Sequence, residues 1–377
     1  MARLFLSPPH MHGTELALVQ QAFESNYIAP LGPMVDAFEL EFCELLDHGN
    51  ALALCSGTAA MHLAMRLVGV GPGTTVLAST LTFIGSIASA LYQGAELAFV
   101  DADRESWCMD SHVLAEALAT CEREGRRVSA VVPTDLYGHP ADMDPILALC
   151  RERGIPVLQD CAEAVGTTYK GRPVGLDADA AIFSFNGNKI ITSSGGGMLC
   201  SANRDLIDRA RNLSQQAREP KPYYEHKEWG YNYRMSNVLA SIGLAQLRVL
   251  PVRVAARRRI FEAYRLGLDN VPGITFMPEA PWAGHNRWLT VIQIDVDKFG
   301  VDPETLRLHL ETDDIETRPV WKPMHLQPVF RGSRCFGSTV AEQLFAGGLC
   351  LPSGSALTDS DIHRVIDRIR TFGECRR

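Results

Sequence analysis

The sequence predicts an α/β fold in which a large domain, built on a mainly parallel central sheet, is followed by a smaller α+β domain at the C-terminal end. From residue 51 to about residue 201, short apolar runs of strand length alternate with amphipathic helical patterns. Such alternation indicates a parallel sheet with helices on both faces. The length of 377 residues favours about two domains, and the pattern changes near residue 250. We therefore expect a large domain over residues 1–250 and a small domain over residues 251–377.

The N-terminal fifty residues or so contain a loop-rich entry and two helical patterns, Glu15–Ser25 and Met34–Leu46. In the alternating region, apolar runs predict strands, and apolar residues at helical spacing predict the helices between them. The expected strands are Ala51–Cys55, Thr75–Ala78, Leu97–Val100, Val128–Pro133, Pro156–Asp160, Ala180–Phe185 and Gly197–Cys200, the last paired with its predecessor as a hairpin. The expected helices are Thr58–Val68, Ile84–Leu91 and Asp144–Arg153.

The rest of the chain begins with a predominantly helical region, residues 204–270, interrupted by a polar aromatic loop at Pro220–Arg234. A long helix near residues 248–268 is expected to join the two domains. The small domain is then predicted to contain the strand Trp288–Val296, the helix Pro303–Leu310, an irregular Pro-rich loop at Arg318–Phe330 and a closing helix at Asp359–Phe372.

Composition excludes several classes of partner. The formal net charge is −8, and the longest basic run is Arg257–Arg259, so neither a nucleic acid nor an anionic membrane is expected as a partner. That run is predicted to be a solvated helix face or an anion contact. The ten cysteines are scattered without CxxC spacing, which predicts no metal site and a reducing compartment. The chain has neither a signal-peptide pattern nor an apolar run of about 18 residues. We therefore expect a cytoplasmic protein.

Lys189 has an unusual sequence setting. It follows an apolar strand within the stretch Ala178–Ser201, and three glycines at 195–197 come after it. Desolvation in such a segment favours the neutral amine, which can condense with a carbonyl group. Taken alone, the segment fits equally well a lysine that caps a strand at the surface. The glycines do not indicate a dinucleotide site, because they lead into a strand and the G-x-G-x-x-G pattern is absent.

Other features fall in loops or at strand ends, and each also has a plainer interpretation. Cys55–Ala59 is a strand-to-helix turn whose backbone amides, with the Thr58 hydroxyl, can hold a phosphate, although a simple helix N-cap is commoner. Phe83 can be a core residue or can stack on a planar ring. Asp160, with Glu163 three residues later, can keep a ring nitrogen protonated or can cap a helix. The donor-rich loop Gly230–Arg234 alone predicts only a surface turn.

Together these features supply a phosphate-binding turn, a stacking ring, a carboxylate and an amine. Pyridoxal 5′-phosphate requires this combination, because it is bound by a lysine and needs an acidic partner for its ring nitrogen. The sequence therefore predicts a site for this cofactor.

The chain resembles the DegT/DnrJ/StrS family of pyridoxal-phosphate sugar aminotransferases over nearly its whole length. The stretches that carry the resemblance are Ser25–Phe38, Ser56–Ala60, Asp160–Gly166, Ser184–Gly197, Gly230–Asn237, Pro323–Gln327 and Leu351–Ser353. Phe5–Met11 and Ser184–Lys189 are most similar to the UDP-N-acetylbacillosamine transaminase branch. The resemblance implies fold type I of the pyridoxal-phosphate enzymes, which is the aspartate aminotransferase fold. It also implies amination of C4 of a UDP-linked 4-keto-2-acetamido-2,6-dideoxyhexose with L-glutamate as donor and pyridoxamine 5′-phosphate as the intermediate form of the cofactor.

The same resemblance implies roles for individual residues. Lys189 would bind the cofactor as a Schiff base, and Asp160 would pair with its ring nitrogen. Asn232 would reach the phosphate of the cofactor in the other subunit, so that a homodimer with its site at the interface is expected. Further cofactor contacts are expected from Gly57, Thr58, Ala59, Phe83, Glu163 and Ser184. Substrate contacts are expected from loop residues that also fit solvated charges or turns, namely Tyr27, Asn188, Arg234, Arg318, Lys322 and His325.

Alternative functions remain open at this stage. A related aminotransferase could act on a dTDP- or GDP-linked 4-keto or 3-keto sugar. A deoxygenating relative would carry His in place of Lys189, and a noncatalytic relative would be expected to lack Lys189 or Asp160, but both residues are present. An aminotransferase for free amino acids would need an arginine for the α-carboxylate in the small domain, and Arg318 could be mistaken for such a residue.

Overall fold

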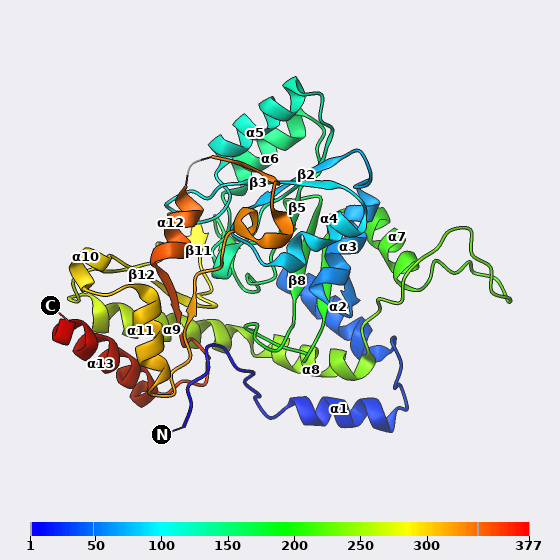
Figure 1. Cartoon of the computed structure of the whole chain (residues 1–377). Coiled ribbons are helices and arrows are strands. Elements are labelled where there is room, and N and C mark those ends of the chain that lie inside the picture. Colours follow the sequence, from blue (N-terminus) through cyan, green and yellow to red (C-terminus); the bar gives the residue numbers. More distant parts are fainter. Residues whose placement is uncertain (1, 48, 338, 377) are drawn as a thin grey trace.

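The structure is a computed structural model that describes residues 2–47, 49–337 and 339–376, with side chains described as far as residue 373. Its centre is a twisted sheet (Figure 1). From one edge to the other, the strand order is β1 (Asn50–Leu54), β9 (Gly197–Ser201), β8 (Ala180–Ser184), β5 (Leu158–Asp160), β4 (Val128–Val132), β2 (Thr75–Ser79), β3 (Glu96–Val100) and β14 (Arg334–Phe336).

The sheet is mainly parallel, as predicted. β9 runs antiparallel to both of its neighbours, β1 and β8, so it forms the predicted pairing with β8 and an additional one with β1. The pairs β8–β5, β4–β2, β2–β3 and β3–β14 are parallel. Parallel bridges from Val131 to Val157 and from Thr134 to Asp160 join β4 to β5. The carboxyl ends of β1, β8, β5, β4 and β2 therefore meet along one edge of the sheet.

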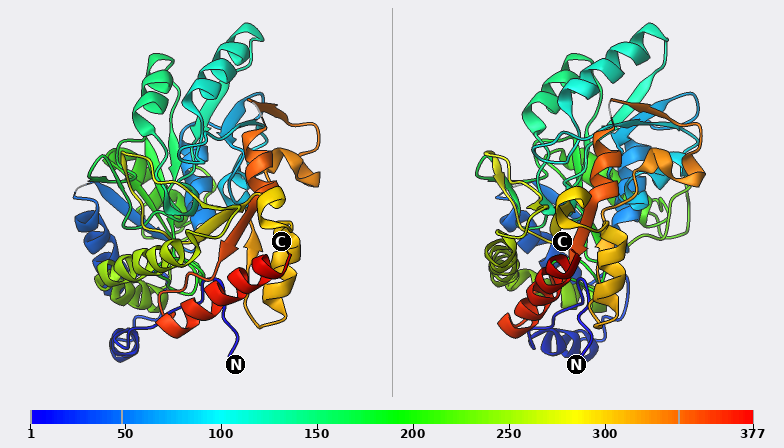
Figure 2. Two further views of the ribbon diagram at one scale, coloured as in Figure 1. Left: turned by 90° about the vertical axis from the view of Figure 1, so that its left-hand side faces the viewer. Right: turned by 60° about the vertical axis from the view of Figure 1, so that its left-hand side comes forward.

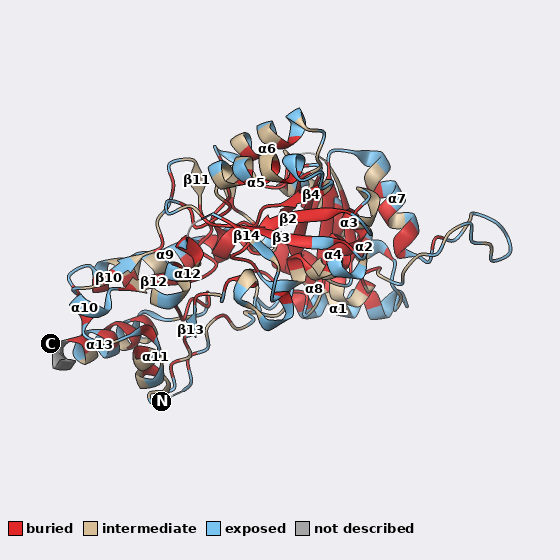
Figure 3. Cartoon of the chain, turned by 45° about the horizontal axis from the view of Figure 1, so that its top comes forward, coloured by how far each residue is buried: buried red, intermediate tan, exposed pale blue. Residues whose placement is uncertain are grey.

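Helices cover both faces of this sheet, and alternate strand residues face one layer or the other. In β1, Ala51 and Ala53 pack on one core while Leu52 and Leu54 pack on the other. Most strand residues are buried, as the red central arrows of Figure 3 show, while Glu96 at the start of β3 and Arg334 at the start of β14 are exposed. One layer contains α2 (Pro33–Leu45), α5 (Ser111–Arg123), α6 (Met143–Glu152) and α8 (Asn237–Arg248), and the other contains α3 (Gly57–Leu67), α4 (Ala88–Tyr92) and α7 (Arg204–Ser214).

The C-terminal part has its own antiparallel sheet and core. The strand order is β10 (Ile274–Phe276), β12 (Thr290–Ile294), β15 (Gly348–Leu351) and β13 (Arg318–Pro319). Its core includes residues of α9 (Leu250–Leu268), α11 (Pro303–Glu311) and α13 (Asp359–Arg376), together with Leu4 from the N-terminal segment. Both chain ends lie at this end of the molecule (Figure 2). The remaining short elements are α1 (Glu15–Glu24), α10 (Val296–Phe299), α12 (Val340–Gly347), β6 (Thr168–Tyr169), β7 (Arg172–Pro173) and β11 (Ala283–Gly284).

The helix α9 leads from the large sheet to this C-terminal part, and it begins at Leu250, where the predicted domain boundary lies. Strand β14, however, returns from residues 334–336 to the edge of the large sheet. The division at residue 250 therefore stays a prediction.

Several local predictions were wrong. Ile84–Leu91, expected to be one helix, is a 3₁₀ turn, η1 (Ile84–Ser86), followed by the short α4. Arg318–Phe330, expected to be irregular, contains β13 and two 3₁₀ turns, Met324–Leu326 and Pro328–Phe330. The run Arg257–Arg259 was expected to be a solvated helix face or an anion contact. Arg258 and Arg259 are exposed, but Arg257 is only 1% exposed, because α9 turns it into the interior.

Two other features concern the outside of the molecule. The loop between α7 and α8 extends away from the body as a long arm (Figure 1). Among the described residues, a length and hydropathy test finds no single helix able to cross a membrane. Within the described ranges, only α8 and α9 taken together are long and apolar enough, and they are bent by 61° relative to each other.

Candidate active site

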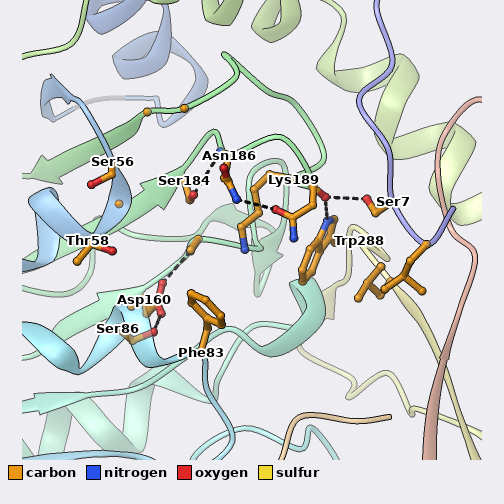
Figure 4. A pocket seen from close by; sticks show the side chains of 18 of the residues that line it. Ser7, Ser56, Thr58, Phe83, Ser86, Asp160, Ser184, Asn186, Lys189 and Trp288 are labelled. Atoms are coloured by element: carbon orange, nitrogen blue, oxygen red, sulfur yellow. Dashed lines mark hydrogen bonds between the residues drawn. The ribbon is translucent and has the colours of Figure 1, made fainter. Parts of the chain in front are cut away.

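A pocket of about 920 Å³ lies at the edge where the parallel strands end, and Lys189 points into it (Figure 4). Its walls come from the N-terminal segment, from loops that follow the large sheet and from the C-terminal part. The residues that line it include Ser7, Ser56, Gly57, Thr58, Phe83, Ser86, Asp160, Ser184, Asn188, Lys189, Trp288, Glu316, Arg318 and Trp321. The pocket therefore joins segments that are far apart in the sequence.

The Lys189 amine is held between a carboxyl group and an aromatic ring. Its Nζ lies 3.3 Å from Oε1 of Glu163 and 4.3 Å from the centre of the Trp288 ring. The side chain is 11% exposed, so the amine is largely shielded from water but remains open to the pocket. This is the setting expected for a lysine that reacts with a carbonyl group.

Asp160 ends β5 and is buried close to the lysine. Its Oδ1 accepts a 3.0 Å hydrogen bond from the Ala162 backbone N–H, and its Oδ2 accepts one from the Ser86 hydroxyl. Burial raises the pKa of Asp160, while the Ser86 bond, the Ala162 bond and the charge of Lys189 oppose the rise. A cation bound beside this carboxyl group would favour its ionised form further.

Glu163 is a second buried acid beside Lys189, and sequence reasoning left its role weakly defined. Its Oε2 accepts a 2.7 Å bond from the Tyr137 backbone N–H, and its Oε1 accepts the bond from Lys189. Burial raises the pKa of Glu163 to about 7, against the opposing effect of Lys189. Around neutral pH, this side chain can therefore donate or accept a proton.

The turn at the amino end of α3 lies next to Ser184 and has backbone N–H groups that the helix itself does not use. The Ser56 hydroxyl accepts the Ala59 N–H at 3.0 Å, so the amide of Ala59 is used as a helix cap. The helix supplies no acceptor for the N–H groups of Gly57 and Thr58, which remain to bind an anion. The start of β9 passes directly behind this turn, because a Cβ on Gly197 would lie 2.6 Å from the Ser56 carbonyl oxygen and closer still to the Gly57 nitrogen.

Aromatic side chains surround the rest of the pocket. Phe83 is 59% exposed and lies opposite Lys189 (Figure 4). Its ring centre is 5.9 Å from that of Trp321, which in turn lies 6.5 Å from that of Trp288. Sequence reasoning missed both tryptophans. Trp288 stands at the start of an apolar run and Trp321 in a Pro-rich loop, so only the tertiary fold brings them to the lysine.

Of the residues predicted to bind substrate, the structure places some in the pocket and others outside it. Asn188 and Arg318 line the pocket, and the Arg318 guanidinium donates to Glu316 at 2.8 Å. The lining residues do not include Tyr27, an exposed residue next to α1, or the exposed Lys322. Within the described residues, Arg234 and His325 also lie outside this lining.

Both of these last two side chains have partners elsewhere. Arg234 is buried 3.4 Å from Glu39, which also forms an ion pair with Arg211. His325 joins the Thr80 hydroxyl, 2.6 Å from Nδ1, to Glu342, 3.2 Å from Nε2. In this chain, His325 therefore fastens the C-terminal loop to the end of β2.

Asn232 lies on the base of the long arm, where it pairs with Gln215, and its side chain is exposed. It does not line the pocket of its own chain, so any cofactor contact would have to be made in another copy. Among the described residues, no group of three or more His, Cys, Asp or Glu side chains is arranged to hold a metal ion.

The residues present fit pyridoxal 5′-phosphate. The pocket contains a reactive amine, a buried carboxyl group for a ring nitrogen, a helix terminus for a phosphate and an exposed aromatic ring. These groups lie together at the carboxyl edge of the sheet, where ligands of open α/β sheets bind.

Comparison with known proteins agrees with this chemistry. Residues 9–370 match the model of the DegT/DnrJ/EryC1/StrS aminotransferase family. The chain is 45% identical, over 97% of its length and 94% of the relative's, to EpsN of Bacillus subtilis, a protein named as a pyridoxal phosphate-dependent aminotransferase. It is 36% identical to the GDP-perosamine synthase of Caulobacter vibrioides, over 97% of each chain.

Among solved structures, the aminotransferase TlmJ of Streptoalloteichus hindustanus superposes with a TM-score of 0.91, at 31% identity and over 99% of each chain. The predicted fold, that of the fold type I pyridoxal-phosphate enzymes, is thus confirmed. The chain belongs to the DegT/DnrJ/EryC1/StrS aminotransferase family, and its cofactor is pyridoxal 5′-phosphate.

Proposed function

We propose that this protein transfers the amino group of L-glutamate to C4 of a nucleotide-linked 4-keto sugar. The observation that carries the proposal is the position of the Lys189 amine, which shares one pocket with buried Asp160 and with the free amides of α3. The family match adds the substrate class, because its members are sugar aminotransferases.

In this proposal, pyridoxal 5′-phosphate, once bound, supplies a ring that accepts electrons from the carbon that exchanges its amino group. Lys189 holds the cofactor and, when released, moves a proton at its Nζ between the reacting carbons. The 11% exposure of its side chain limits the access of water to that proton.

Two acids would support the lysine. Asp160 would remain ionised and keep the ring nitrogen protonated, which strengthens the electron-accepting character of the ring. Glu163, 3.3 Å from Nζ and with a pKa of about 7, would hold or release a proton beside the amine. Gly57, Thr58 and Ser184 would bind the phosphate, and Phe83 would stack on the ring.

The finer proposal is that the sugar is a UDP-linked 4-keto-2-acetamido-2,6-dideoxyhexose. It is supported by the similarity of Phe5–Met11 and Ser184–Lys189 to the UDP-N-acetylbacillosamine transaminase branch. Both segments take part in one site, because the Ser7 hydroxyl bonds to the Asn188 carbonyl at 2.7 Å. Asn188 and Arg318 are the pocket residues proposed to contact the nucleotide sugar, while Tyr27, Arg234, Lys322 and His325 would need another arrangement or another subunit.

A GDP-linked 4-keto-6-deoxyhexose is the second candidate. It is favoured by the 36% identity to a relative named GDP-perosamine synthase. The two candidates differ in the nucleotide base, which is uracil or guanine, and at C2 of the sugar, which carries an acetamido group in the first and a hydroxyl group in the second.

Turnover of a panel of 4-keto sugars decides between them. The purified holoenzyme is incubated with L-glutamate and UDP-, dTDP- or GDP-linked sugars, and the amino sugar and 2-oxoglutarate are measured by mass spectrometry. We expect the highest kcat/KM with the UDP-linked 2-acetamido sugar. Preference for the GDP sugar would replace the finer proposal, and transamination confined to free 2-oxo acids would overturn the sugar assignment.

We further propose a homodimer in which the exposed Asn232 of one subunit completes the phosphate site of the other. The position of Asn232 outside the pocket of its own chain supports this proposal.

A cytoplasmic location is supported by the cysteines, which are free at each of the nine described positions.

A further inference from the structure

A line of buried hydroxyl groups leads to Asp160 across the ends of neighbouring strands. Thr134 follows β4, Thr82 follows β2, and Ser86 lies in η1. Thr134, Thr82 and Ser86 are exposed by 2%, 1% and 5%, respectively. Water therefore cannot easily satisfy these groups, and their protons must be shared within the protein.

The distances connect the three hydroxyls in series. The Thr134 Oγ1 donates to the Thr82 Oγ1 at 2.9 Å, and the Thr82 Oγ1 lies 2.8 Å from the Ser86 Oγ. The Ser86 Oγ donates to Oδ2 of Asp160, as the dashed line in Figure 4 shows. The backbone N–H of Thr134 is itself fixed by the Ser79 Oγ at 3.1 Å.

The direction of this series follows from the number of protons available. Each hydroxyl has one proton to donate. An ionised Asp160 can only accept, so Ser86 gives it its proton and must accept from Thr82. Thr82 in turn accepts from Thr134. The alternative acceptor for Thr82, the Phe83 carbonyl, lies 3.5 Å away, which is a weaker contact. With Asp160 ionised, each bond in the series points toward the carboxylate.

We propose that Thr134, Thr82 and Ser86 form a donor chain that keeps Asp160 ionised and fixed in orientation for the ring nitrogen of the cofactor. The three are thus positioning residues, and the inference rests on the proposed role of Asp160. Successive hydrogen bonds that point the same way polarise one another and strengthen the last one. The hydrogen bonds of this donor chain favour the ionised form of Asp160, whereas burial alone favours its neutral form.

Other titratable groups also face Asp160 and must be kept constant in any test. Lys189 favours its ionised form. Asp135, Glu163 and the Cys161 thiol lie close enough to interact with its charge. None of the proposed substitutions changes these groups.

The test measures protonation of the cofactor nitrogen directly. Holoenzyme is prepared with pyridoxal 5′-phosphate labelled with ¹⁵N in the ring, and the ¹⁵N chemical shift is followed as pH rises. At a given pH, in Ser86→Ala we expect the proton shared by the ring nitrogen and Asp160 to shift about tenfold from the nitrogen toward Asp160 relative to the wild type, which is the effect of losing one hydrogen bond to a charged carboxylate. In Thr82→Val we expect about a threefold effect, because only the polarisation of the last bond is lost.

Conservative variants separate this role from packing. Thr82→Ser keeps the hydroxyl and should restore the wild-type titration, and Thr134→Val should have a smaller effect than Thr82→Val. The dissociation constant of the cofactor should rise in the same order. Wild-type ¹⁵N titrations in both Ser86→Ala and Thr82→Val would overturn the donor chain. An unchanged titration in Asp160→Ala would instead overturn the proposed role of Asp160 itself, so the two failures are distinguishable.

Discussion

The indole nitrogen of Trp288 donates a 2.8 Å hydrogen bond to the backbone carbonyl of Asn188, the residue immediately before Lys189. The same carbonyl accepts the Ser7 hydroxyl at 2.7 Å. Arg257 links the two donors to each other, because its guanidinium donates to the Ser7 Oγ at 2.9 Å and to the Trp288 carbonyl at 2.8 Å. Ser7, Asn188, Trp288 and Arg257 thus form a closed ring of contacts. Three distant segments thus fix the backbone that carries Lys189.

Removing both donors to the Asn188 carbonyl should weaken cofactor binding by more than the sum of the two single changes. Trp288→Phe keeps an aromatic ring beside Lys189 but loses the indole N–H, and Ser7→Ala loses the hydroxyl. Each single variant should lose about 1 kcal/mol of cofactor binding, since the carbonyl keeps one donor. The double variant leaves the carbonyl unpaired and should lose about 1 kcal/mol more than the sum.

The measurement is a double-mutant cycle on the cofactor dissociation constant and on kcat. Trp282→Phe is the matched control, because the indole nitrogen of Trp282 is buried without a hydrogen-bond partner in the described structure. Strictly additive effects of Trp288→Phe and Ser7→Ala would show that the two donors act independently of one another.

The ring of contacts around Asn188 shows where sequence reasoning stops. Lys189, Asp160 and the turn at Gly57 and Thr58 were recognisable because each stands next to a strand whose apolar run is itself visible. Trp288 begins a predicted strand of the C-terminal part and Trp321 lies in a Pro-rich loop, so neither position in the sequence indicates a place beside Lys189. They reach the pocket only because the C-terminal part folds back over the sheet, which depends on contacts between distant segments.

Arg257 is a different case, because the sequence did contain a usable signal. Arg253, Arg257, Ile260 and Tyr264 are separated by three or four residues and share the buried face of α9. The three adjacent arginines at 257–259 look like a run of surface charge, and this obscures the helical periodicity that places Arg257 on the buried face. Burial lowers the pKa of Arg257 to about 9, which is the cost of placing a guanidinium where it can bind both Ser7 and Trp288.

Gly197 should tolerate no side chain, because β9 passes directly behind the turn at Ser56 and Gly57. In Gly197→Ala the new Cβ would meet the backbone of Ser56 and Gly57, and backbone atoms cannot move aside as a flexible side chain can. We expect a loss of about 3 kcal/mol in the free energy of unfolding, together with at least tenfold weaker cofactor binding.

Urea unfolding and cofactor titration test this prediction. Gly195→Ala, two residues earlier, is the control, because its Cβ would meet nothing within 4 Å, and it should change stability by less than about 1 kcal/mol. Equal effects of the two substitutions would mean that the turn is not constrained by β9.

If Asn232 completes the site of a second subunit, a mixed dimer of two inactive variants should regain activity. Lys189→Ala removes the reactive amine, and Asn232→Ala should weaken cofactor binding. A mixed dimer of these variants has one site with both residues and one with neither. Random mixing should therefore recover about a quarter of wild-type activity.

The activity is measured after the two proteins are unfolded and refolded together, with each variant refolded alone as the control. Asn232→Ala should also raise the cofactor dissociation constant without moving the absorption band of the bound cofactor. Activity of the mixture equal to the average of the separate variants would exclude a shared site.

The buried Glu163 should make the cofactor-free protein less stable as pH rises. Its pKa is raised from 4.5 to about 7 in the folded state. Below the unfolded value both states are protonated and the stabilising effect is complete. Between about pH 4.5 and 7 the unfolded state releases the proton first, so this contribution, about 3 kcal/mol, is progressively lost. Glu163→Gln cannot ionise and should not show this loss.

Urea unfolding of both proteins at several pH values measures the difference. Asp135, with a pKa also raised to about 7, is common to both proteins, so its contribution cancels. Relative to the wild type, the variant should gain stability from pH 5 to pH 8, and a difference that stays constant over this range would contradict the assignment of this titration to Glu163.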